Sequence, residues 1–330
     1  MANLRAGLIG LGMMGRHHAR VLRAIDGVDL VGVADPVGDP YGVAGQLDVM
    51  QDIDALIGVG LDYCVVAVPT AYHEEIGLAL AAAGVHALVE KPLAKDTLGA
   101  RKLAEAFEAA GLAGAVGHIE RYNPALQSLR LRLAAGELGQ VYQIITRRQG
   151  PFPARIADVG VVKDLATHDI DLTAWVADQP YVSVAAHTAY QSGREHEDLV
   201  AVTGKLADGT VTSHLVNWLS PMKERVTIVT GDRGAFVADT LHADLTFHAN
   251  GSTRTQWDDL AQFRGVSEGD VIRYAIPKPE PLRTEHEAFR DAILGKEVDV
   301  VTMTQGLATV AVAEAVLQSA AEGRTVALPS

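Results

Sequence analysis

The feature that most constrains the fold is a glycine-rich segment near the start of the chain, Gly10-Leu-Gly-Met-Met-Gly15. It follows a short apolar run and precedes a helical pattern, which is the context of a dinucleotide-binding turn. Gly10 permits the tight turn from strand to helix, Gly12 lets a pyrophosphate approach the backbone, and Gly15 lets helix and strand pack closely. The helix begins near Met13 and Met14, where unpaired N–H groups can bind the phosphates.

Asp35 lies twenty residues beyond Gly15, directly after a second apolar run over residues 30–34. A carboxylate at this spacing can accept hydrogen bonds from both hydroxyls of the adenosine ribose, and it repels the additional phosphate of NADP. We therefore expect NAD as the cofactor, in preference to NADP. A glycine-rich turn of some other α/β fold would explain the glycines alone, but it explains the acidic residue less well.

The chain is long enough for two domains, and the pattern of the sequence changes near residue 120. Before this point short apolar strands alternate with helices, which predicts an α/β Rossmann domain with a parallel sheet over residues 1–120. Beyond it, strands follow one another without intervening helices, which predicts an α+β domain with an open, mainly antiparallel sheet over residues 121–330. The final helix of this second domain can pack back on the first.

The expected elements follow from apolar runs and from turn and cap residues such as Asp96 and Gly111. In the first domain we expect strands over residues 5–9, 30–34, 63–68, 86–89 and 113–117, and helices over residues 74–83 and 97–111. In the second domain we expect strands over residues 141–148 and within 182–276, helices over residues 124–135, 163–177, 282–294 and 302–321, and a polar loop over residues 256–270.

Composition argues against several kinds of partner and site. The net charge of −13 disfavours binding to nucleic acid or to an anionic membrane, because both attract basic surfaces. Cys64 is the single cysteine and lies in an apolar run, so we interpret it as a buried strand residue. The chain cannot form an internal disulfide, which fits a cytoplasmic location. The first apolar run is interrupted by glycines and is neither a signal peptide nor a membrane span. Without histidines at ligand spacing, we expect no metal site.

The motif Glu90-Lys91-Pro92 follows the predicted strand over residues 86–89. Ligands of an open parallel sheet bind beyond the carboxyl ends of its strands, so Lys91 is delivered to the cofactor crevice. A lysine there can polarise a substrate hydroxyl and stabilise developing alkoxide charge. Pro92 fixes the backbone and can carry a cis bond. Taken alone, a surface lysine at the end of a strand would be the simpler interpretation.

A second motif places Asp164 four residues before His168 in a predicted helix. Residues at this spacing share a helix face, and a carboxylate beside an imidazole can fix its tautomer and raise its basicity. Histidine is the natural base to take a hydroxyl proton as hydride leaves the same carbon. For an arbitrary helix, an ordinary surface pair would be the simpler interpretation.

Together these motifs make the chain resemble the Gfo/Idh/MocA family of oxidoreductases over essentially its whole length. The resemblance rests on the glycine fingerprint, on Pro69-Thr70-x-x-His73 after the third strand, and on the motifs around Lys91 and His168. It implies a Rossmann domain followed by an α+β domain with an open antiparallel sheet. It also implies an enzyme that uses NAD(P) to oxidise or reduce sugars and polyols.

The resemblance further implies roles for single residues. Lys91 and His168 are the catalytic pair, and Asp164 assists them. His73 can at the same time lie in the first turn of the following helix, and that position is compatible with a contact to the nicotinamide. Thr70 and His73 line the nicotinamide side. The residues of these two motifs assigned to cofactor binding are Pro69, Thr70, His73, Glu90 and Lys91.

A longer match narrows the substrate. Residues 117–124, 150–162 and 163–171 resemble the UDP-N-acetylglucosamine 3-dehydrogenase group, which includes the 3-dehydrogenases of the corresponding uronate. These enzymes oxidise the hydroxyl at sugar carbon 3 to a ketone. Lys163 departs from the pattern, since an apolar residue is expected there, and it can signal a different substituent on the sugar.

Basic residues near this match can bind a diphosphate on an otherwise acidic protein. Asn123 can donate a hydrogen bond to a sugar or acetamido oxygen, and His168 contacts the reacting hydroxyl. For any one arginine, a solvated surface residue is an equally good interpretation. The residues assigned to the substrate are Arg121, Tyr122, Asn123, Arg155, Lys163 and His168.

Other functions remain open at this stage. Rivals within the family are an inositol or other sugar or polyol dehydrogenase and a reductase of a dTDP-ketosugar. A rival of another class is an NAD-sensing protein without catalysis, although a sensor needs none of Lys91, Asp164 and His168. The expected partner is a small-molecule nucleotide sugar. Apolar strands such as residues 182–190 and 199–202 leave a sheet face to be covered, which predicts a homodimer or homotetramer through the C-terminal sheet.

Overall fold

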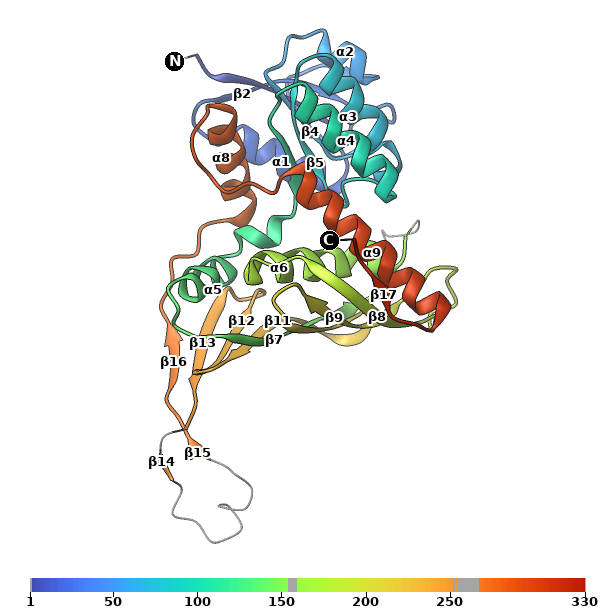
Figure 1. Cartoon of the computed structure of the whole chain (residues 1–330). Helices are drawn as coiled ribbons and strands as arrows, with labels where there is room; N and C mark the ends of the chain where they lie inside the picture. Colours follow the sequence, from blue (N-terminus) through green and yellow to red (C-terminus); the bar gives the residue numbers. More distant parts are fainter. Residues whose placement is uncertain (1, 154–158, 252, 255–266, 330) are drawn as a thin grey trace. The chain divides into compact units, whose positions relative to one another are not determined.

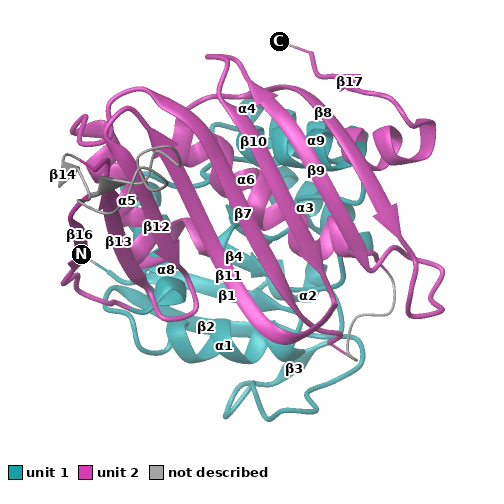
Figure 2. Cartoon of the chain, turned by 90° about the horizontal axis from the view of Figure 1, so that it is seen from below, with its two compact units in different colours: residues 1–119, 280–314 teal, residues 120–279, 315–330 magenta. Residues whose placement is uncertain are grey.

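Two sheets, each with its own helices, organise the chain in the computed structural model, which describes residues 2–153, 159–251, 253–254 and 267–329 (Figures 1 and 2). Unit 1 comprises Met1–Ile119 and Glu280–Glu314, and unit 2 comprises Glu120–Pro279 and Ala315–Ser330. The chain therefore crosses between the units near residues 120, 280 and 315, whereas the sequence analysis draws a single boundary at residue 120. In the described parts of the chain, no helix is both long and apolar enough to span a bilayer.

The sheet of unit 1 has six parallel strands in the order β3-β2-β1-β4-β5-β6. This order confirms the predicted Rossmann fold. The chain builds the sheet outward in one direction from β1 to β3 and in the other from β4 to β6, and such folds bind ligands at the point between β1 and β4. Nearly all central strand residues are buried, as expected for a sheet covered on both faces. The strands are β1 Leu4–Ile9, β2 Val28–Ala34, β3 Val49–Met50, β4 Tyr63–Val66, β5 His86–Glu90 and β6 Gly114–Gly117.

Helices cover both faces of this sheet. Leu80 and Leu103 pack in one buried cluster, and Leu22 and Phe289 pack in another, so α3 and α4 lie on one face and α1 and α8 on the other. Asp96 caps α4 by accepting a 2.9 Å hydrogen bond from the amide of Gly99, as the sequence predicts. The helices are α1 Met13–Leu22, α2 Ile53–Ile57, the short η1 Thr70–Tyr72, α3 His73–Ala82, α4 Thr97–Ala109, α8 Pro281–Ile293 and α9 Met303–Glu322, whose last turns belong to unit 2.

The sheet of unit 2 has nine strands in the order β16-β13-β12-β11-β7-β10-β9-β8-β17, and only β7 and β10 pair in parallel. The prediction of an open, mainly antiparallel sheet is confirmed. The strands are β7 Val141–Pro151, β8 Tyr181–Ala189, β9 Leu199–Leu206, β10 Val211–Asn217, β11 Leu219–Gly231, β12 Gly234–Asp239, β13 Asp244–Ala249, β16 Val271–Tyr274 and β17 Val326–Ala327.

One face of this sheet carries the helices α5, Pro124–Ala134, and α6, Thr167–Ala177. Apolar side chains of both helices share a buried cluster with Ile144 and Phe236 of the sheet. Figure 2 shows the other face in front of these helices, and no described helix of unit 2 covers it. The short strands β14, Thr253–Arg254, and β15, Ser267–Glu268, pair with each other, and most of the predicted polar loop lies outside the described residues.

Candidate active site

The glycine turn after β1 has the backbone geometry that its sequence predicts. Gly10 has a φ of +94°, and a Cβ atom there would collide with the backbone of Ala67. A Cβ atom on Gly15 would collide with the carbonyl of Gly10, whereas a Cβ atom on Gly12 would meet open space. No described side chain caps α1, which starts at the exposed Met13. A pyrophosphate therefore fits in front of this helix, on N–H groups that the helix leaves unpaired.

Asp35 follows β2, and its carboxylate is fixed beside the same turn. Its Oδ2 accepts a hydrogen bond from the amide of Leu11 at 2.8 Å, and its Oδ1 accepts one from the amide of Val37 at 2.8 Å. The side chain is half-buried. Each carboxylate oxygen has a second lone pair, so the ribose hydroxyls of a dinucleotide still find acceptors here.

The turn that carries Lys91 lies at the same edge, because β4 and β5 are parallel neighbours. The peptide bond between Lys91 and Pro92 is cis, which the sequence analysis allows. His73 is buried and lies between this turn and the end of β4: Nδ1 lies 2.9 Å from the carbonyl oxygen of Pro92, and Nε2 lies 3.0 Å from that of Val68. A neutral imidazole donates to only one of these two acceptors. Burial lowers the pKa of His73 despite these carbonyls.

Unit 1 thus brings most of the predicted cofactor residues to the carboxyl edge of its sheet. Pro69 is exposed and precedes η1, and Thr70 begins it, one strand away from Lys91. Topology places these residues beside the glycine turn, as expected at the point where the strand order reverses. The contact of each residue with a cofactor remains a prediction.

Asp164 and His168 lie at the start of the long helix of unit 2. The sequence predicts one helix over residues 163–177, and the structure has a π-helical turn, η3 Val162–Ala166, followed by α6. Both side chains are only 8% exposed. Single π-helical turns occur frequently at functional sites, because they widen the helix locally and redirect side chains.

The predicted substrate residues of unit 2 lie in different surroundings. Arg121 donates from Nε and Nη2 to the carboxylate of Asp171 at 2.7 and 2.6 Å, and both side chains are buried. Asn123 accepts from the amide of Ala125 at the start of α5 and donates to the carbonyl of Thr240. These contacts give Arg121 and Asn123 structural tasks, and a role in substrate binding remains a prediction for both.

Two of the other residues assigned to the substrate lie in the described part of unit 2. Tyr122 is buried, with 6% of its surface exposed, and Lys163 is half-buried within η3. Arg155 lies outside the described residues.

A largely buried ion network beneath α6 is not predicted by the sequence. Arg148 of β7 donates from Nε to Asp169 at 2.7 Å and from Nη1 to Glu120 at 3.0 Å. Burial raises the pKa of Asp169, and Arg148 offsets this only in part. The signal in the sequence is two acidic residues, Asp169 and Asp171, among apolar residues of a predicted helix. The structure shows that the first half of this helix is buried. Buried carboxylates require cationic partners, and the register of β7 supplies one of them.

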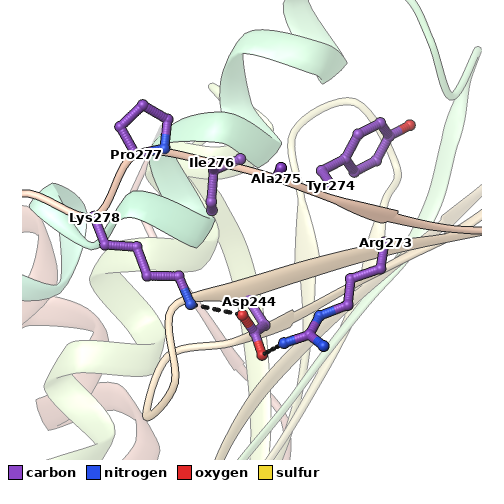
Figure 3. Close-up of a pocket in the computed structure, with 7 residues that line it drawn as sticks. All are labelled: Asp244, Arg273, Tyr274, Ala275, Ile276, Pro277 and Lys278. Atoms are coloured by element: carbon purple, nitrogen blue, oxygen red, sulfur yellow. Dashed lines mark hydrogen bonds and ion pairs between the residues drawn. The ribbon is translucent and has the colours of Figure 1, made fainter.

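Unit 2 also has a hollow that is lined by other residues (Figure 3). It is lined by Asp244 and residues 273–278. Lys278 donates to one oxygen of Asp244 at 2.7 Å and Arg273 to the other at 2.6 Å. None of the residues predicted from the sequence as catalytic or binding lines it, and exposed ion pairs of this kind contribute little to stability.

Comparison with known proteins defines the class to which this fold and these motifs belong. Residues 4–118 match the NAD-binding Rossmann fold of the Gfo/Idh/MocA oxidoreductase family, and residues 130–328 match its C-terminal alpha/beta domain. The chain belongs to this family, whose relatives include dehydrogenases that act on sugar hydroxyls. The predicted family, enzyme class and NAD cofactor are thereby confirmed.

Individual relatives resemble the chain at moderate identity. UDP-N-acetylglucosamine 3-dehydrogenase of Acidithiobacillus ferrooxidans is 32% identical over 89% of this chain and 90% of its own length. A structure of that enzyme superposes with a TM-score of 0.84, covering 97% of this chain and 98% of the other. Inositol 2-dehydrogenase 2 of Saccharopolyspora erythraea is 30% identical over 98% of this chain and 94% of its own length. GenD2 from gentamicin A biosynthesis, in complex with NAD, is 28% identical with a TM-score of 0.82, covering 100% of this chain and 97% of that chain.

Proposed function

We propose that this protein is an NAD-dependent dehydrogenase that oxidises the 3-hydroxyl of a UDP-N-acetylated amino sugar or of the corresponding uronate. The observation that carries the proposal is the 32% identity to UDP-N-acetylglucosamine 3-dehydrogenase over nearly the whole length of both chains. The second candidate is oxidation of inositol or another polyol, because an inositol 2-dehydrogenase matches at 30% identity over 98% of this chain.

In the proposed reaction, His168 takes the proton of the sugar hydroxyl while the carbon that bears it loses a hydride. The ammonium group of Lys91 stabilises the negative charge that develops on the oxygen. Asp164 precedes His168 by four residues and favours the protonated product form of the imidazole. NAD, when bound, accepts the hydride. Of the basic residues, Lys163 and Arg155 are proposed to bind the diphosphate, whereas Arg121 is already paired with Asp171.

A substrate panel tests the proposal. Production of NADH is measured with UDP-N-acetylglucosamine, its uronate, free N-acetylglucosamine and myo-inositol, with an aminotransferase present to remove the ketone. We expect turnover with the UDP-sugars and little with the free sugar, because loss of the nucleotide discards binding energy that lowers the barrier. Comparable rates with inositol or unactivated sugar would favour the second candidate.

Substitution of the proposed catalytic pair tests the mechanism. Lys91→Ala and His168→Ala should each bind NAD normally and lose about a hundredfold or more in kcat, the usual size of a general acid–base contribution. Asp164→Asn should cost less and shift the pH profile of kcat. Near wild-type turnover by His168→Ala would show that another group takes the proton.

We also propose that copies of the chain associate through the open face of the unit 2 sheet. Ile145, Ile228 and Val237 are half-buried and lie in one cross-strand row over β7, β11 and β12. Leu215 of the neighbouring strand β10 is 38% exposed on the same face. A continuous apolar row on a sheet face without helices is suited to a second copy of the same surface.

A further inference from the structure

Unit 1 contains a largely buried chain of ionisable side chains to which the proposed reaction gives no role. His18 of α1 lies between two partners: its Nε2 is 2.9 Å from Oε1 of Glu90, and its Nδ1 is 2.8 Å from Nε2 of His286 in α8. His18 and His286 are 0% and 1% exposed. We call Glu90, His18 and His286 the histidine chain. It connects the helix of the phosphate turn, the end of β5 and a helix from the far end of the sequence.

The chemistry of the three groups fixes the direction of the hydrogen bond to Glu90. Burial alone would raise the pKa of Glu90, but the hydrogen bond and charge of His18, together with Lys91, outweigh this and lower it. Glu90 is therefore a carboxylate, and only a histidine with a proton on Nε2 can satisfy it. Burial, with His18, holds the pKa of His286 well below its usual value, so His286 is neutral.

The second oxygen of Glu90 leads directly to the proposed catalytic lysine. Oε2 accepts a hydrogen bond from the backbone amide of Lys91 at 3.1 Å. On the neighbouring strand β6, a Cβ atom on Gly117 would lie 3.2 Å from the Glu90 carboxyl carbon, so glycine leaves room for this inward turn of the carboxylate. His18 thus binds the carboxylate of Glu90, which in turn accepts the backbone amide of Lys91. Nδ1 of His73 lies 2.9 Å from the next carbonyl oxygen, that of Pro92.

We propose that Glu90 and His18 are positioning residues that fix the Lys91 turn relative to the phosphate-binding helix, with His286 orienting the ring of His18. The proposal rests on the proposed function in so far as Lys91 is catalytic. It accounts for the placement of two buried histidines and a largely buried carboxylate at this point. Apolar residues of similar volume would otherwise pack here without a desolvation cost.

Amide hydrogen exchange and steady-state kinetics on the full chain test the proposal. His18→Leu removes the donor to Glu90, and His18→Gln retains an N–H donor at a similar distance from the backbone. We expect His18→Leu to accelerate exchange of the Lys91 amide and to lower kcat by about ten- to a hundredfold, the effect of losing one hydrogen bond to a charged group. The NAD dissociation constant should change little. His18→Gln should restore most of the protection of the Lys91 amide from exchange and most of kcat.

His17→Leu is the matched control, since His17 is the adjacent, half-buried residue of the same helix and belongs to no site described above. It should leave exchange and kcat unchanged. If His18→Leu does not fold, Glu90→Gln decides, because it keeps the shape but places an N–H group against either the amide of Lys91 or the Nε2 proton of His18.

The outcomes separate this proposal from the proposed function. Normal exchange at the Lys91 amide in His18→Leu or Glu90→Gln would overturn the positioning role, whatever the substrate is. An equal loss in His18→Gln and His18→Leu would also overturn it, because the donor would then be irrelevant. Accelerated exchange in a protein that oxidises none of the sugars would support the positioning role and count against the proposed function alone.

Discussion

Among single residues, Asp35 carries the choice of cofactor. Its carboxylate is held in place by the amides of Leu11 and Val37, so it cannot easily turn away from a phosphate on the ribose. A contact between two negative charges costs several kcal/mol. The protein should therefore bind NAD at least about a hundredfold more tightly than NADP. Fluorescence titration with both cofactors measures the ratio, and Asp35→Ser should reduce it strongly. Equal binding of NADP by the unchanged protein would exclude this role for Asp35.

Glu285 is a second residue with a consequence that can be measured. It is 1% exposed, neither carboxyl oxygen has a hydrogen-bond partner among the described residues, and burial with the charge of Glu90 raises its pKa well above the usual value. The folded protein therefore keeps a proton that the unfolded chain releases above about pH 4.3. Because only the unfolded chain loses this proton, the free energy of unfolding falls as the pH rises above about 4.3. The fall ends once the pH exceeds the raised pKa of Glu285 in the folded protein.

Glu285→Gln removes this dependence. As the pH rises above about 4.3, the melting temperature of the variant should increasingly exceed that of the unchanged protein. The neighbouring titratable groups Glu90, His18 and His286 are present in both proteins, so their contributions largely cancel in the difference. A melting difference that is independent of pH would show that Glu285 ionises in the folded protein as it does in the unfolded chain.

Among the elements, α6 depends on ion pairs with the sheet. Arg148→Met would leave the buried Asp169 without its paired cation and Glu120 with only the more distant Arg225, and breaking a buried pair in this way costs about 3–5 kcal/mol. Denaturant unfolding should show this loss. Arg273→Met is the matched control, because its pair with Asp244 is exposed and worth about 1 kcal/mol or less. A loss no larger than that of the control would mean that the network contributes little.

The same helix shows what the sequence can and cannot predict. Apolar periodicity and the spacing of Asp164 and His168 predict a helix over residues 163–177, and the structure has one there. The π-helical turn at Val162–Ala166 leaves no trace in that periodicity, because the buried side chains extend all round the helix. The pairing of Asp169 with Arg148 depends on the register of β7, which is set by tertiary contacts rather than by local sequence.

For the whole molecule, the order of strands and helices predicts both sheets, since parallel and antiparallel sheets differ in whether helices separate their strands. The return of α8 to unit 1 could not be predicted in this way. Its buried Phe289 packs against Tyr63, and Arg290 donates to the carbonyl of Asp26, which are contacts between segments more than 200 residues apart. An amphipathic pattern indicates that α8 buries one face, but it does not identify the core that covers that face.

Association of the whole chain is the last prediction. The row of Ile145, Ile228 and Val237 lies on the face of the unit 2 sheet that no described helix of that unit covers. Light scattering at micromolar concentration should therefore give a dimer or tetramer. Ile145→Lys combined with Ile228→Lys should shift it toward monomer, because two charges would have to be buried at the centre of the contact. Val271→Lys, on β16 near the edge of the sheet, is the control, since Val271 is already 62% exposed.

A folded double variant that keeps the oligomer would place the interface elsewhere on the protein. If the unchanged protein is a monomer by light scattering, this apolar row is exposed to solvent, since antiparallel sheets can leave one face solvated. The polar residues interspersed on the same face, such as Gln143, Arg147 and Lys205, would then be its solvated surface rather than the rim of a contact. Hydrogen exchange cannot separate these cases, because the strand amides are paired in both, so the mass in solution is the deciding measurement.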